Sequence, residues 1–114
     1  MHGPALAKLE KPRPRRFSKA ALGATALAAS LAAHGGDPLR GVDLYRQHCS
    51  ACHGVGGKPV LPTAPDFTRP TALLKPDLAL MASIRQGRGA MPAYDGVLRE
   101  RDILDIVAHL RTLR

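Results

Sequence analysis

The sequence predicts an all-α fold of about three helices joined by loops rich in proline and glycine. Three segments have helical starts, stops or apolar periodicity, and no segment has the alternation typical of a strand. The chain has 114 residues but only two Tyr, two Phe and no Trp. Because aromatic side chains supply much of the buried area of a small core, a domain this poor in them needs another source of stability.

The N-terminal 35 residues have the features of a secretory signal peptide, which places the folded domain at residues 36–114. Six Lys or Arg precede the uncharged, alanine-rich run Ala20 to Ala33, which ends in small side chains. That run is shorter than the roughly 20 apolar residues that cross a bilayer. We therefore expect export with cleavage and no membrane span, and an uncleaved N-terminal anchor is the alternative.

Positive charge is concentrated in this leader. The formal net charge is +8, of which +5 lies before residue 20 and +3 after residue 36. The later Lys and Arg are dispersed and are not interleaved with aromatic residues, so the composition gives little support for nucleic-acid binding.

The first helix is expected from Pro38 to about Cys49. Asp37 can cap the free amides of the first turn, and the fixed backbone angle of Pro38 suits the first helical position. Val42, Tyr45 and Cys49 fall on one face of this helix.

A long loop is expected from Gly54 to Lys75. It contains three glycines near its start and four prolines from Pro59 to Pro70, without sustained periodicity. Its composition is compatible with an ordered loop and with a disordered one.

The second helix is expected from Pro76 to Gln86, with Gly87 as its stop. Leu78, Met81 and Ala82 would lie on one side of it. A turn-rich segment, residues 87–96, separates it from the third helix.

The third helix is expected from about Leu98 to Leu113. Acidic residues lie near its start and Arg111 near its end, as the helix dipole favours. Its apolar stripe consists of Ile103, Ile106, Val107, Leu110 and Leu113.

The residues Cys49-Ser50-Ala51-Cys52-His53 match CxxCH, the attachment signature of c-type haem. Cysteines three positions apart at a helix end project to one side, where their sulfurs can add to two vinyl groups while the adjacent imidazole binds iron. Attachment follows export, in agreement with the leader. One covalent haem wrapped by the helices and loops would also compensate for the scarcity of aromatic side chains.

Two other interpretations of the cysteines are weaker. A thioredoxin-like redox pair would need a βαβ setting, which the sequence lacks, and would not need His53. A zinc site needs four ligands, and the contiguous residues from His48 to His53 cannot surround one ion tetrahedrally.

Met91 is the candidate for the second axial ligand. It lies in the turn-rich segment and is followed by Pro92. A thioether is neutral and soft, favours Fe(II), raises the potential and closes the iron to substrates. Met81 is the rival candidate, but its mid-helix position is typical of core packing. An open iron, or one with another ligand, is the remaining possibility.

Four motifs occur together in the chain: GVDLY from Gly41, CSACHG from Cys49, GAMPAY from Gly89 and DIVAHL from Asp105. With them, essentially everything after Asp37 resembles a small bacterial class I cytochrome c domain. The resemblance implies the cytochrome c-like fold, with a few helices around one haem c.

The resemblance also implies particular contacts. Gly41 and Tyr45 would lie where the first and last helices cross, and His109 stands where an aromatic residue is usual. His53 would donate its second ring N–H to a proline carbonyl, for which Pro65 is the candidate acceptor. The alternative is that Pro65 only stiffens the loop.

Three further residues are candidates near the haem. Phe67 would pack on it, and Arg88 and Arg69 could pair with its propionates, although exposed arginines are usually solvated. His48 and His34 are expected to be exposed. The helical placement of His109 argues against its being an iron ligand.

The predicted function is periplasmic transfer of one electron at a time by a haem with His53 and Met91 as axial ligands, without enzymatic activity. Its partners would be redox proteins such as a dehydrogenase or an oxidase. The alternatives are an electron-transfer subunit of a larger oxidase or dehydrogenase complex, and an open-site haem enzyme or gas sensor.

Overall fold

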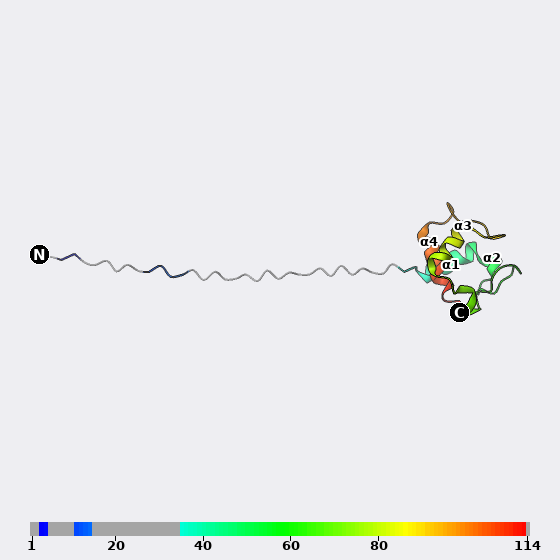
Figure 1. The fold of residues 1–114 in the computed structure, drawn as a ribbon, viewed down its shortest axis with the longest axis horizontal. Helices are drawn as coiled ribbons and strands as arrows, with labels where there is room; N and C mark the ends of the chain where they lie inside the picture. The colour runs from blue at the N-terminus through cyan, green and yellow to red at the C-terminus, as the bar shows by residue number, and fades with distance from the viewer. Residues whose placement is uncertain (1–2, 5–10, 15–34, 114) are drawn as a thin grey trace. The chain divides into compact units, whose positions relative to one another are not determined.

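The computed structural model describes residues 3–4, 11–14 and 35–113. Its helices are α1 (Pro38–His48), α2 (Ser50–His53), the 3-10 helix η1 (Pro70–Leu73), α3 (Asp77–Gln86) and α4 (Glu100–Leu110) (Figure 1). The all-α prediction is confirmed: the described residues form no strand, and α2 is an additional single turn. None of the helices in this part of the chain has the length and apolar character needed to cross a bilayer.

The predicted leader lies almost entirely outside the described residues. Only residues 3–4, 11–14 and 35 of it are described, and His34 is not. The expected signal peptide and its cleavage therefore stay predictions.

Helix α1 begins as the sequence predicts and ends at His48, one residue earlier than expected. The side chain of Asp37 accepts hydrogen bonds from the backbone amides of Leu39, at 2.9 Å, and Arg40, at 3.4 Å. These two amides belong to the first turn, where the backbone N–H groups have no acceptor within the helix. The side chain of Asp37 supplies that acceptor.

The implied crossing of α1 and α4 is confirmed. A Cβ atom on Gly41 would lie 2.0 Å from the carbonyl oxygen of Asp105, so the two backbones approach as closely as glycine permits. Tyr45 is fully buried one turn later, where it packs against His109. Its hydroxyl donates a hydrogen bond of 2.7 Å to the carbonyl oxygen of Gly54.

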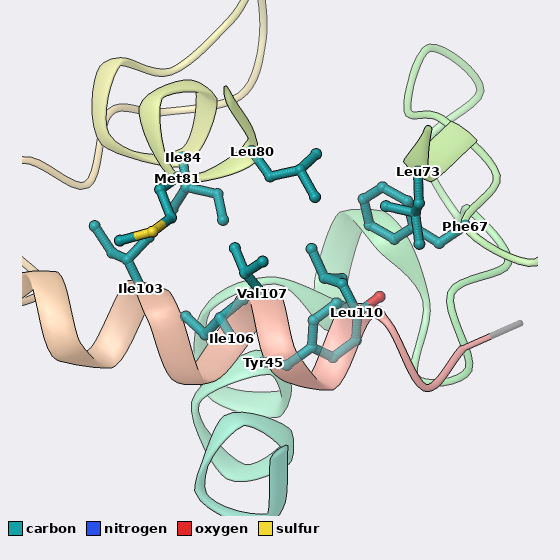
Figure 2. Close-up of a cluster of buried hydrophobic side chains, with 10 residues drawn as sticks. All are labelled: Tyr45, Phe67, Leu73, Leu80, Met81, Ile84, Ile103, Ile106, Val107 and Leu110. Atoms are coloured by element: carbon teal, nitrogen blue, oxygen red, sulfur yellow. The ribbon is translucent and has the colours of Figure 1, made fainter. Parts of the chain in front are cut away.

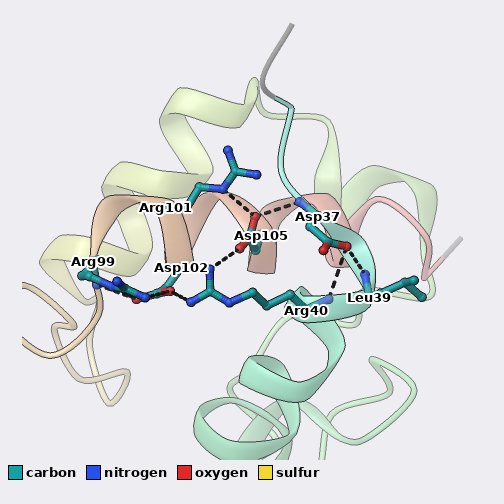
Figure 3. A network of polar contacts seen from close by, with 7 residues as sticks. All are labelled: Asp37, Leu39, Arg40, Arg99, Arg101, Asp102 and Asp105. Carbon is teal, nitrogen blue, oxygen red and sulfur yellow. Dashed lines mark hydrogen bonds and ion pairs between the residues drawn. The ribbon is translucent and has the colours of Figure 1, made fainter. Parts of the chain in front are cut away.

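A network of charged side chains joins α1 to the first half of α4 (Figure 3). Its members are Asp37, Arg40, Arg99, Arg101, Asp102 and Asp105. The fully buried carboxylate of Asp105 accepts from the backbone amide of Asp37 at 2.7 Å and from the guanidinium groups of Arg40 and Arg101 at 3.2 Å each. Arg40 also bonds Asp102, so one arginine of α1 connects two carboxylates of α4.

Helix α3 starts within one residue of its predicted start and stops at the predicted Gly87. Its predicted apolar side is confirmed at Met81, which is buried, and wrong at Leu78, which is 79% exposed. The residues that α3 buries are Leu80, Met81 and Ile84. Apolar residues lie on both sides of this short helix, so periodicity alone does not select the face, and the position of α4 does.

Helix α4 is shorter than expected, but its apolar stripe is confirmed apart from Leu113, which is half-buried beyond the helix end. Figure 2 shows the stripe facing side chains of α3 on one side and of the long loop on another. The buried core consists of Tyr45, Phe67, Leu73, Leu80, Met81, Ile84, Ile103, Ile106, Val107 and Leu110.

The loop from Gly54 to Lys75 has a defined path and contributes to this core. Phe67 and Leu73 are buried, and the backbone amide of Phe67 donates to the carbonyl oxygen of Gly57 at 2.9 Å. Arg111, after α4, donates to the carbonyl oxygens of Leu73 and Lys75. Of the two loop alternatives, the ordered one is correct.

Candidate functional site

A cavity of about 380 Å³ is lined by the CxxCH segment, the long loop, α3 and the turn that follows α3. Its lining includes seven of the residues that the sequence selects: Cys49, Cys52, His53, Pro65, Phe67, Arg88 and Met91. Much of the rest is apolar, including Leu61, Ala64, Leu80, Ile84 and Leu110. A concave, largely apolar site with a few polar groups is the usual form of a cofactor site.

The CxxCH segment is shaped by α2 and the glycine after it. The backbone amides of His53 and Gly54 donate to the carbonyl oxygens of Cys49 and Ser50, each at 2.9 Å. Gly54 has φ +76°, and a Cβ atom there would lie 1.9 Å from the carbonyl oxygen of Lys58. Only glycine permits this reversal, which returns the loop across the motif.

The imidazole of His53 is buried and stacks on the ring of Phe67, with centroids 4.6 Å apart and an interplanar angle of 16°. Burial lowers the pKa of His53, which favours the neutral imidazole that metals bind. The hydrogen bond expected to the carbonyl of Pro65 is absent, because the Nδ1 atom of His53 has no partner among the described residues. Stacking on Phe67 orients the ring instead, and Pro65 lines the cavity.

The two cysteines are free thiols. Burial and, second, the neighbouring Cys52 raise the pKa of Cys49 to about 11. A redox-active CxxC pair lowers the pKa of a cysteine to generate a thiolate, so the thioredoxin-like interpretation has no support. The described part of the chain also contains no group of three or more His, Cys, Asp or Glu that could hold a metal ion.

Met91 is held in a tight turn directly after α3. Arg88 and Met91 exchange two backbone hydrogen bonds, of 3.1 and 2.9 Å. A Cβ atom on Gly87 would lie 2.7 Å from the carbonyl oxygen of Met91, so this turn packs on the glycine that ends α3. Met81, the rival ligand, is 5% exposed within the core and is absent from the cavity lining.

The remaining candidates separate into two groups. Arg88 is exposed and lines the cavity, as does His48, which is half-buried and not exposed as predicted. Arg69 is 77% exposed, pairs with Asp66 at 3.6 Å and does not line the cavity. His109 is buried at the helix crossing, also outside the lining, so the structure does not bring it to the site.

Sequence reasoning missed Tyr94, which also lines the cavity. Its hydroxyl donates a hydrogen bond of 2.6 Å to the carbonyl oxygen of His48. Burial raises the pKa of Tyr94, and the nearby Cys49 and Cys52 raise it further by a smaller amount. The sequence signal that could have found Tyr94 is its place three residues after Met91, because residues this close in a turn-rich segment lie close together in space.

These residues fit a covalently bound haem. Cys49 and Cys52 supply two free thiols to the lining of a largely apolar cavity, and His53 supplies a neutral imidazole with a buried nitrogen that has no partner among the described residues. Met91 adds a soft thioether from a different segment.

The family described as "Cytochrome C oxidase, cbb3-type, subunit III" matches residues 36–110, which include the cavity's two cysteines, His53 and Met91. The chain belongs to the c-type cytochromes. This c-type cytochrome is 35% identical to cytochrome c6 of Chlorolobion braunii over 81 residues, which are 65% of this chain and 88% of the relative. It is 37% identical to the cbb3-type cytochrome c oxidase subunit FixP of Bradyrhizobium diazoefficiens over 82 residues, 69% of this chain and 28% of FixP.

Its fold is similar to that of a solved structure named KustC0563 c-type cytochrome. The TM-score is 0.62 at 26% sequence identity, and the match covers 65% of this chain and 96% of the other. As a c-type cytochrome, the protein binds one haem c covalently and transfers electrons, and it is not an enzyme. It exchanges those electrons with other redox proteins.

Proposed function

We propose that this c-type cytochrome is a free periplasmic carrier of single electrons, with His53 and Met91 as the two axial ligands of its haem iron. The observation that carries the proposal is that both side chains line one cavity together with Cys49 and Cys52. When bound, a c-type haem supplies an iron that alternates between Fe(II) and Fe(III), and so accepts and releases one electron.

The residues of the chain have defined tasks in this proposal. Cys49 and Cys52 would hold the haem through thioether bonds, and His53 would bind the iron as a neutral imidazole. Met91 would occupy the other axial position, raise the potential and exclude other ligands. No general acid, base or nucleophile is needed, because the cofactor performs the redox chemistry.

Electron exchange would occur on the side of Cys52, which is exposed. Cys49 on the other side of the motif is only half-buried. A redox partner would approach the site at this exposed edge. Residues 1–35, as a signal peptide, would deliver the chain to the periplasm, where attachment takes place.

Absorption spectra of the protein, exported together with haem-attachment machinery, test the ligand assignment. The oxidised wild type should have the weak near-infrared sulfur-to-iron band and a low-spin spectrum. Met91→Ala should lose the band, lower the potential and bind carbon monoxide when reduced. Met81→Leu is the matched control and should keep the band, because Met81 is buried in the core. A wild type without the band would contradict the proposal and favour the open-site enzyme or sensor.

A second candidate function is that of an electron-transfer subunit in an oxidase or dehydrogenase complex. The match to FixP favours it. The region that resembles this chain is 28% of FixP, so a domain of this kind occurs there as one part of a larger oxidase subunit. Purification from the native membrane and soluble fractions distinguishes the two. A free carrier is recovered alone, whereas a subunit is recovered with a larger redox protein in fixed stoichiometry.

A further inference from the structure

Tyr94 connects the turn of Met91 to the end of α1. Its hydroxyl donates a hydrogen bond of 2.6 Å to the backbone carbonyl of His48, the residue directly before Cys49. The ring of Tyr94 also meets the imidazole of His48 edge-on, with centroids 5.9 Å apart and an angle of 77°. The contact thus ends at the residue that precedes the CxxCH segment.

The residues that follow the Met91 turn are bonded to α3 by their backbone. The amides of Tyr94 and Asp95 donate to the carbonyl oxygens of Ile84 and Arg85, each at 3.1 Å. These bonds hold the turn to the helix that precedes it. Among the hydrogen bonds of the described residues, the one from Tyr94 to His48 connects residues 87–98 to α1 and the CxxCH segment.

The carbonyl of His48 needs a donor from outside its helix. It lies at the C-terminal end of α1, where the last carbonyls have no intrahelical partner. The amide of Cys52, which would continue the helical pattern, bonds the carbonyl of Cys49 instead, at 3.2 Å. A phenylalanine at position 94 could fill the same space but would leave this carbonyl without the hydroxyl donor.

We propose that Tyr94 is a positioning residue that holds the Met91 turn against the CxxCH segment and thereby limits how readily Met91 leaves the iron. The inference rests on the proposed ligation by Met91. Met91 lies three positions before Tyr94 and is fixed to Arg88 on its other side, so the hydroxyl restrains the turn at the end nearest the cysteines. Without that restraint, the turn more often adopts arrangements in which Met91 is away from the iron. A competing ligand then needs less free energy to displace Met91.

Titration of the oxidised, haem-containing protein with imidazole tests this inference in Tyr94→Phe and Tyr45→Phe. Both variants lose one hydroxyl that bonds a backbone carbonyl, but Tyr45 bonds Gly54, directly after His53, and its hydroxyl does not bond the segment that contains Met91. Tyr94→Phe should bind imidazole about three to ten times more tightly than the wild type, with loss of the near-infrared band at correspondingly lower imidazole concentration. Tyr45→Phe should lower the midpoint of unfolding while its imidazole affinity stays within about twofold of the wild type.

Two outcomes would overturn the inference. Unchanged imidazole affinity in Tyr94→Phe would show that the hydroxyl does not restrain Met91. An equal gain in Tyr45→Phe would show that the effect follows from lower stability in general. A wild type without the sulfur-to-iron band would instead refute the proposed ligation itself, and with it the role of Tyr94.

Discussion

The imidazole of His109 meets the ring of Tyr45 edge-on, with centroids 5.0 Å apart and ring planes inclined at 61°. The family resemblance leads one to expect an aromatic residue at position 109, and His109 preserves the ring contact while adding a titratable group. The side chain is 7% exposed, and its Nε2 atom has no hydrogen-bond partner among the described residues. Burial, and second the nearby Arg46, lower the pKa of His109 below its ordinary value of 6.5.

His109→Phe should therefore reduce the loss of stability in acid. The unfolded chain takes up the proton near pH 6.5, whereas the folded protein takes it up only at lower pH. The free energy of unfolding is thus highest above pH 6.5, falls as the pH drops below it, and levels off once the folded pKa is passed. Denaturant unfolding at about pH 7.5 and about pH 5 should give a smaller difference for the variant than for the wild type. An unchanged difference would mean that His109 is not the group responsible.

Replacing each of three glycines by alanine should show how much of the loss of stability comes from backbone strain and how much from steric contact at the Met91 turn. Gly87 has φ +72° and no room for a Cβ, Gly89 has φ +56° with open space around it, and Gly56 has neither restriction. Gly87→Ala should cost about 2–4 kcal/mol, Gly89→Ala about 1 kcal/mol and Gly56→Ala close to zero. Denaturant unfolding measures the series, and Gly87→Ala should also weaken the near-infrared band. Equal costs at Gly87 and Gly89 would show that the close contact of Gly87 with residues 91–93 contributes nothing.

Asp105→Ala should be strongly destabilising. It leaves the amide of Asp37 and the guanidinium groups of Arg40 and Arg101 without their buried acceptor. Removal of one partner of a fully buried ion pair costs about 3–5 kcal/mol, and because both arginines are over two-fifths exposed we expect about 2–3 kcal/mol.

Asp77→Ala is the matched control for Asp105→Ala. Asp77 pairs with Arg111 at 2.6 Å, but its side chain is 56% exposed. Its removal should cost about 1 kcal/mol or less. Similar midpoints of thermal unfolding for the two variants would show that burial of Asp105 does not strengthen the network.

Much of the fold could be predicted where a local signal suffices. Asp37 before Pro38 caps α1, Gly87 stops α3, and each acts through its own backbone or the first turn of one helix. The site residues could be predicted from the sequence for the same reason. CxxCH is a contiguous motif, and Met91 lies in a segment whose composition predicts a turn.

The rest depends on partners that are distant in sequence. Leu78 is as apolar as its neighbours, and only the position of α4 leaves it exposed. Asp105 appears polar in an amphipathic helix, yet Arg40 and the chain before α1 bury it completely. The acceptor of the Tyr94 hydroxyl is likewise 46 positions away, beyond what spacing reveals.

The crossing of α1 with α4 also imposes an order in time. The glycine of this crossing, Gly41, contacts Asp105, so the α1–α4 contact cannot form until the last helix has been synthesised. In a chain exported before it folds, α1 has no surface to pack on, and Cys49 and Cys52, about fifty residues before that contact, lie on an open backbone. Covalent attachment after export would use this interval, before the crossing forms.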